Sequence, residues 1–144
     1  MFEIKTINAN DTYELRKDVL NYPTIDECQY KGDLLEQTVH IGATKDEQII
    51  GVASFYHETN KELKNRNMYR LKGLAIDPKH RNQLRGQTLL LFAENILRQK
   101  GVELIWCTTK LKNIDYYHHL GFKKVERLIQ SPSKGLQVLM YKMI

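Results

Sequence analysis

A run of basic and amide side chains stands directly ahead of an amphipathic segment in the middle of the chain. The run follows Asp77-Pro78 and ends at Gly86, and its polar members are Lys79, His80, Arg81, Asn82, Gln83 and Arg85. The first turn of a helix offers unpaired backbone N–H groups and a partial positive charge, so a glycine-containing basic turn that leads into a helix can hold a phosphate. We therefore expect this turn to bind an anion; the alternative is a solvated corner.

A second group of side chains with possible chemistry lies near the C-terminal third of the chain. Tyr116 and Tyr117 are followed by two histidines and then by Leu120, Gly121 and Phe122. Gly121 is suited to end a short helix that carries the tyrosines, and Phe122 would begin another strand. The alternative is that the tyrosines and histidines form only a packed and solvated helix surface.

The two stretches together resemble the two signatures of the GNAT superfamily of acetyl-CoA-dependent N-acetyltransferases. The acyl-CoA pyrophosphate loop of that superfamily reads Arg or Gln, two residues, Gly, one residue, then Gly or Ala. Here Arg81 opens the pattern and Gly86 closes it, whereas Leu84 replaces the first glycine. Residues 116–122 match the second signature, an aromatic pair followed by Leu-Gly-Phe. The resemblance covers residues 38–126.

The resemblance implies a site for acetyl-CoA as cosubstrate, with no metal. In the superfamily the turn binds the pyrophosphate, the backbone of a bulged strand pairs with the pantetheine amides, and a tyrosine protonates the departing CoA thiolate. Tyr117 occupies the place of that acid, and the ordinary pKa values of a phenol and a thiol differ by only about 1.5 units. The implied cofactor-binding residues are Leu74, Ala75, Ile76, Arg81, Asn82, Gln83, Leu84, Arg85, Gly86, Gln87 and Asn113.

The activity that the resemblance implies is acetyl transfer to a primary amine of a small molecule or peptide, by direct attack in a ternary complex. Many relatives place a glutamate on the fourth strand as general base, but Arg70 and Lys72 occupy the exposed positions there. His40, His57 and Glu58 lie on or beside the neighbouring strands, but we expect each of them to be structural or solvent-facing. We therefore expect a water relay. A non-catalytic acyl-CoA-binding module is the alternative function.

Composition and charge limit the classes of protein to which the chain can belong. With 144 residues, 42% of them hydrophobic and 27% charged, the chain (1–144) is predicted to be one folded domain. The net charge of +5 suits a polyanionic cofactor. Nucleic-acid binding is not favoured, because no basic face interleaved with aromatic residues stands out in the sequence. We expect no signal peptide and no membrane span, hence a cytoplasmic protein with reduced cysteines. A homodimer is left open.

Hydrophobic periodicity predicts the helices and strands that position these candidate site residues. A long helix from Gln87 ends at Gly101, and shorter helices are expected near residues 11–20 and around the tyrosines. The acidic segment 22–36 reads as a surface loop or short helix. The expected strands cover residues 2–6, 38–43, 49–56, 68–76 and 102–107, one strand that starts at Phe122, and residues 136–143.

The fourth strand carries a change of phase. Tyr69 and Leu71 are apolar at odd positions, whereas Leu74 and Ile76 are apolar at even ones, so one residue must be inserted in a β-bulge at 72–74. The resemblance implies that such a bulge opens a gap beside this strand. We expect a mixed α/β fold with a mostly antiparallel sheet of six or seven strands, about four flanking helices, and one parallel pair joined by the long helix.

Overall fold

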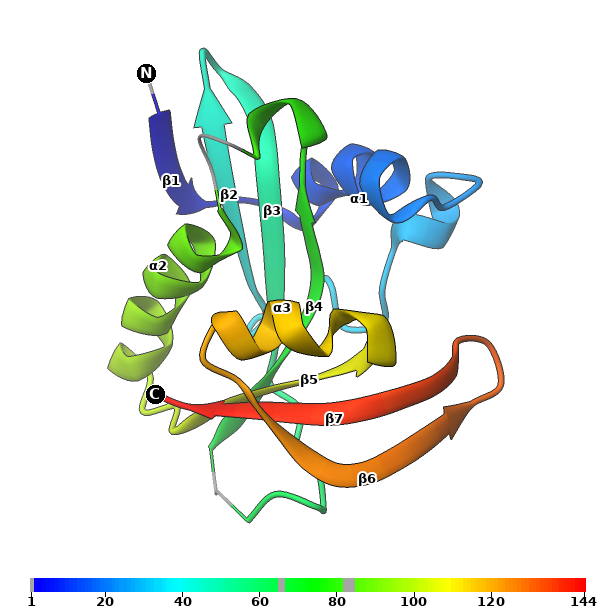
Figure 1. Cartoon of the computed structure of the whole chain (residues 1–144). Coiled ribbons are helices and arrows are strands. Elements are labelled where there is room, and N and C mark those ends of the chain that lie inside the picture. Colours follow the sequence, from blue (N-terminus) through cyan, green and yellow to red (C-terminus); the bar gives the residue numbers. More distant parts are fainter. Residues whose placement is uncertain (1, 65–66, 82–84) are drawn as a thin grey trace.

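The computed structural model describes residues 2–64, 67–81 and 85–144. Within these residues one seven-stranded sheet has the order β1-β2-β3-β4-β5-β7-β6 (Figure 1). Every neighbouring pair is antiparallel except β4 and β5, which are parallel. The strands are β1 (Phe2–Thr6), β2 (Val39–Lys45), β3 (Gln48–Tyr56), β4 (Met68–Ile76), β5 (Leu104–Lys110), β6 (Lys123–Ser131) and β7 (Gly135–Met143).

The described residues form three α-helices, so the expectation of about four flanking helices is wrong. They are α1 (Tyr13–Leu20), α2 (Gly86–Gln99) and α3 (Ile114–His119). The acidic segment 22–36 contains only the 3-10 turn Asp26–Cys28. Its side chains bond to nearby backbone instead: the Asp33 carboxylate accepts the N–H of Tyr30 at 2.8 Å, and such local bonds compete with helix formation. No helix in the described ranges is long and apolar enough to cross a membrane.

The helices divide between the two faces of the sheet. α2 and α3 cover one face and α1 covers the other (Figure 1). Alternation along β3 explains the division, because Phe55 belongs to the core beneath α2 whereas Ser54 points to α1, where it contacts Arg16. The apolar stripe of α2 is buried at Leu89, Leu90, Ala93 and Leu97, and burial of each leucine contributes roughly 1.5–3 kcal/mol of transfer free energy.

The parallel pair β4 and β5 separates soon after it begins. Met68, Tyr69 and Arg70 pair with β5, and the described part of the two strands forms no further pair. The predicted bulge is confirmed: Ser54 of β3 lies opposite Lys72 but Val52 lies opposite Ala75, so β4 carries one extra residue. Gly73 takes the positive φ of 67° that the bulge requires, which favours glycine. In Figure 1 β4 runs up the view while β5 runs across it.

Candidate active site

The N-terminus of α2 is the first part of the site. Arg85 stands at the N-cap in an extended backbone conformation and its side chain forms no capping bond, and no acidic residue lies in the first turn. The backbone N–H groups of Gly86 and Gln87 therefore start an uncapped helix of 14 residues, which is a favourable place for an anion. Arg81, Arg85 and Gln87 are exposed around it. Asn82, Gln83 and Leu84 lie outside the described residues.

The tyrosine helix α3 packs directly on this turn. Gly86 is buried, and a Cβ added there would overlap the hydroxyl group of Tyr116. Burial raises the pKa of Tyr116, and the charge of Arg81 partly offsets that rise, which places the phenol close to the basic turn. The tertiary structure therefore joins the two sequence signatures at one place, although sequence reasoning assigned no position to the Tyr116 side chain.

Tyr117 packs on the core near Cys107, the residue of β5 that follows the last pair with β4. It is half-buried, and its ring packs edge-on against Phe122 with centroids 5.7 Å apart and against Tyr116 at 5.3 Å. Burial raises the pKa of Tyr117 above its ordinary value, and the neighbouring Cys107 and Tyr116 raise it further. Burial also raises the pKa of the Cys107 thiol to about 12. Both side chains are therefore protonated at neutral pH, so Tyr117 can donate a proton.

The predicted pantetheine-binding residues lie along β4 beyond the bulge. Ala75 and Ile76 pair with Val52 and Gly51 of β3, and Leu74 packs on the core. The other edge of β4 has no strand partner after Arg70 in the described part of the chain, so its backbone groups are available to an extended ligand. Asn113 stands at the N-cap of α3, half-buried, without a side-chain capping bond.

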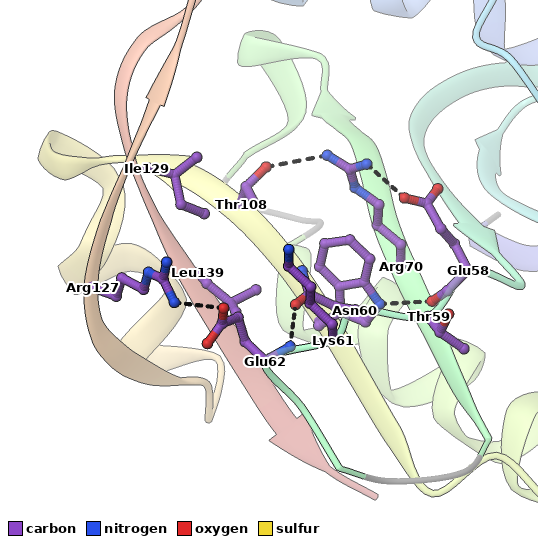
Figure 2. A pocket seen from close by; sticks show the side chains of 11 residues that line it. Glu58, Thr59, Asn60, Lys61, Glu62, Arg70, Thr108, Arg127, Ile129 and Leu139 are labelled. Carbon is purple, nitrogen blue, oxygen red and sulfur yellow. Dashed lines mark hydrogen bonds and ion pairs between the residues drawn. The ribbon is translucent and has the colours of Figure 1, made fainter.

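The opposite face of the sheet, on the side of α1, holds a cavity of about 640 Å³ that sequence reasoning did not predict. The Arg70 guanidinium lies between its two partners there (Figure 2): it donates to the Glu58 carboxylate at 2.9 Å and to the Thr108 hydroxyl at 3.2 Å. It also lies over the Trp106 ring, 4.8 Å from the centroid. Arg127 of β6 pairs with Glu62 at 2.6 Å across the same cavity.

This cavity adjoins the gap because Arg70 and Trp106 are the last paired residues of β4 and β5. A ligand in the cavity would therefore face the place where the two strands separate, with α3 and the N-terminus of α2 on the far side. No local motif marks the lining residues; they come from β4, β5, β6, β7 and the segment after β3. Only the order of strands brings them together, which is why sequence reasoning missed the cavity.

Next to the cavity lies a buried polar cluster centred on Arg16 of α1. Arg16 is fully buried; its guanidinium donates to both oxygens of Asp33 at 2.8 and 3.2 Å and to the Ser54 hydroxyl at 2.8 Å. Tyr56 donates its hydroxyl hydrogen to the same carboxylate. The expectation that the acidic segment 22–36 lies on the surface is therefore wrong for Asp33, because that carboxylate is the buried counterion of a buried cation.

The histidines and the acid near the fourth strand have structural partners, as expected. His40 contacts the Ser54 hydroxyl and the Asp33 carbonyl through its two ring nitrogens, and burial lowers its pKa, so the ring is neutral at neutral pH. His57 stacks on Tyr69, and Glu58 is paired with Arg70. Among the described residues no group of three His, Cys, Asp or Glu side chains is placed to hold a metal ion.

Comparison with known proteins agrees with this geometry. Residues 4–122 match the family model described as the acetyltransferase (GNAT) family. The chain is 36% identical over 143 residues to an uncharacterized N-acetyltransferase, YitI, of Bacillus subtilis (strain 168), covering 99% of this chain and 96% of the relative.

Two solved structures share the fold. The ribosomal-protein-S18-alanine N-acetyltransferase from Escherichia coli superposes with a TM-score of 0.75 at 17% identity, covering 100% of this chain and 94% of that one. An aminoglycoside 6'-N-acetyltransferase complexed with coenzyme A superposes with a TM-score of 0.74 at 12% identity, covering 98% and 96%. At these identities the likeness is one of fold alone.

Proposed function

Because the chain belongs to the GNAT family of acetyltransferases, we propose that it transfers an acetyl group from acetyl-CoA to a primary amine of a small molecule or peptide. The observation that carries the proposal is the gap between β4 and β5, which has the uncapped N-terminus of α2 and Tyr117 on one side and the cavity at Arg70 on the other. Acetyl-CoA would enter from the first side and the amine from the second.

In this proposal the pyrophosphate of acetyl-CoA binds the turn at the start of α2. The residues from Arg81 to Gln87 bind it with their backbone N–H groups and with the two guanidinium groups of Arg81 and Arg85. Asn82, Gln83 and Leu84, which lie outside the described residues, belong to this proposed set. The pantetheine arm lies along the unpaired edge of β4 at Leu74, Ala75 and Ile76, and Asn113 lies beside it. The coenzyme A in the structurally similar aminoglycoside 6'-N-acetyltransferase supports this choice of cosubstrate.

The chemical step is direct attack of the neutral amine on the thioester carbonyl. Backbone N–H groups of the bulged strand polarise the carbonyl, the C–N bond forms and the C–S bond breaks. Tyr117 gives its proton to the departing thiolate and regains a proton from solvent before the next turnover. The amine loses protons to water, since no free carboxylate stands on the β4 face near Arg70 and Lys72 among the described residues. Cys107 takes no part, because burial keeps it as a thiol.

The proposal is tested by incubating the protein with acetyl-CoA and a panel of primary amines while measuring release of free thiol. We expect release that depends on the presence of a suitable amine. Calorimetric titration of acetyl-CoA into the same preparation is the control. Binding without turnover across the panel would favour the non-catalytic acyl-CoA-binding module instead.

The phosphate turn gives a separate prediction. Gly86→Val places a branched side chain on the backbone that the pyrophosphate would approach, so affinity for acetyl-CoA should fall about tenfold or more. The fold should survive, because the nearest atom to the new Cβ is the Tyr116 hydroxyl, at the end of a flexible side chain. Calorimetry measures the affinity, and a thermal melt reports the fold.

The double variant Gly86→Val/Tyr116→Ala separates two causes of that loss. It removes the hydroxyl that the valine would displace, but leaves the valine against the phosphate. Affinity should therefore stay low in the double variant. Recovery of wild-type affinity would show that the loss came from displacement of Tyr116 and not from a phosphate at Gly86.

A further inference from the structure

Lys72 holds a half-buried positive charge on the α1 side of the gap. It lies on β4 two residues beyond Arg70, on the same face of the sheet, opposite Ser54 of β3. Its ammonium nitrogen lies 4.7 Å from the centroid of the Tyr30 ring and 5.7 Å from that of Tyr56. These rings hold the side chain over the sheet, between the cavity at Arg70 and the buried cluster of Arg16.

The carboxylates nearest to Lys72 are committed to other cations. Glu58 is paired with Arg70 at 2.9 Å, and Asp33 is held by Arg16 at 2.8 Å. Throughout residues 2–64, 67–81 and 85–144, no carboxylate pairs with Lys72 itself. Burial lowers the pKa of Lys72, and the charges of Arg70 and Lys134 lower it further, against the opposing charges of Glu58 and Asp33. A cation so placed is stabilised by an incoming anion.

The neighbouring Arg70 also retains an unused donor. Its Nε–H is buried and has no hydrogen-bond partner in the described structure, although its other nitrogens contact Glu58 and Thr108. Lys134, in the turn between β6 and β7, adds a third positive charge that acts on Lys72. Three cationic side chains thus lie on the acceptor side of the gap: strand β4 supplies two of them and the turn between β6 and β7 supplies the third.

We propose that the acceptor amine carries an anionic group, a carboxylate or a phosphate, which Lys72 binds while the amine reaches the gap between β4 and β5. This inference rests on the proposed function and names the class of its acceptor. Arg70 Nε and Lys134 assist at the same group. An acceptor with several amines, such as an aminoglycoside, would place further positive charge against Lys72 and is disfavoured, because like charges in a partly desolvated site repel.

The test uses matched pairs of amines that differ in the anionic group. The pairs are glycine with glycinamide, β-alanine with β-alaninamide, and O-phosphoethanolamine with ethanolamine, and kanamycin serves as the polycationic acceptor. We expect kcat/KM to be at least about tenfold higher for an anionic member than for its neutral partner. The carboxylate and phosphate arms show which of the two anions is the natural group.

Variants of Lys72 assign the preference to this side chain. Lys72→Met should abolish the preference, Lys72→Arg should retain most of it, and Lys72→Glu should shift it toward the neutral members and kanamycin. Thermal melts and acetyl-CoA titrations accompany each variant, and Lys72→Arg remains informative if Lys72→Met fails to fold. An anionic preference that is absent in the wild type, or unchanged by Lys72→Met, overturns the inference.

A binding experiment separates this inference from the proposed function. The anionic panel members are titrated by calorimetry into the protein saturated with CoA, at low and high salt. Binding that weakens with salt and is lost in Lys72→Met supports the anion site even if no amine is acetylated, an outcome that would refute only the transfer reaction. Acetylation of neutral amines without any binding of the anionic members refutes only the anion site.

Discussion

Tyr117→Phe is expected to lower the turnover number about 10²-fold or more while leaving acetyl-CoA affinity and the fold intact. The change keeps the ring that packs on Phe122 and Tyr116 and removes only the hydroxyl group. If that hydroxyl protonates the departing thiolate, the loss falls on the chemical step. Some activity should persist, because a CoA thiolate is a tolerable leaving group and positioning alone supplies much of the rate.

The surroundings of Tyr117 bear on whether it can act as an acid. Burial raises the pKa of Tyr117, which by itself would make the phenol a poorer donor to a thiolate. The same apolar surroundings also raise the pKa of a thiol, however, and burial raises the pKa of the nearby Cys107 in this way. A CoA thiolate formed beside Tyr117 should be a stronger base than in water for the same reason, so proton transfer remains feasible.

Steady-state kinetics with a confirmed acceptor measures the effect, and Tyr116→Phe is the matched comparison. It deletes the same atom from the adjacent residue, whose hydroxyl faces Gly86 and not the gap. The turnover number of Tyr116→Phe should stay much closer to that of the wild type. Equal turnover in the wild type and in Tyr117→Phe would reduce Tyr117 to a packing residue.

Arg16→Met is expected to cost about 3–5 kcal/mol of unfolding free energy, the largest stability effect that we predict. The substitution removes the partner of Asp33 and leaves a carboxylate uncompensated in a buried site. It also deprives the Ser54 hydroxyl and the Cys28 carbonyl of a donor. The melting temperature should fall on the order of 10 °C for a domain of this size.

Chemical denaturation measures this loss, and Lys17→Met is the matched control. Lys17 is the next residue on α1 but is partly exposed and lies 3.9 Å from Asp18, so its loss should change stability by less than about 0.5 kcal/mol. The double variant Arg16→Met/Asp33→Asn removes the stranded charge and should be less destabilised than the sum of the single changes. Strict additivity would contradict the ion pair as the source of the effect.

The unfolding free energy lost in Arg16→Met should depend on pH in a defined direction. Burial opposes ionisation of Asp33, but hydrogen bonds from Arg16, Tyr56 and the Tyr30 N–H outweigh it and lower the pKa. The wild-type ion pair therefore contributes stability above the ordinary aspartate pKa, and that contribution is lost as the pH falls through the lowered pKa. Without Arg16 the buried carboxylate can protonate more easily, so the difference in stability between the two proteins should shrink in acid.

Much of the secondary structure, and part of the site, could be predicted from the sequence because the signals are local. Alternation of apolar residues predicts the strand Phe2–Thr6, and the three-and-four spacing after Gln87 predicts α2, as the structure has them. The change of phase between Leu71 and Leu74 predicts the bulge for the same reason: the faces of a strand alternate with a period of two, so one inserted residue is visible in the pattern.

Only the tertiary structure decided which of these local features meet. The contact of Tyr116 with Gly86, the burial of Asp33 against Arg16, and the place of Lys72 beneath Tyr30 each join segments far apart in the chain. A carboxylate in a polar loop has the same sequence signature whether it is solvated or buried. Its state depends on which face of the sheet α1 covers and on the order in which the strands lie, and no local period encodes either.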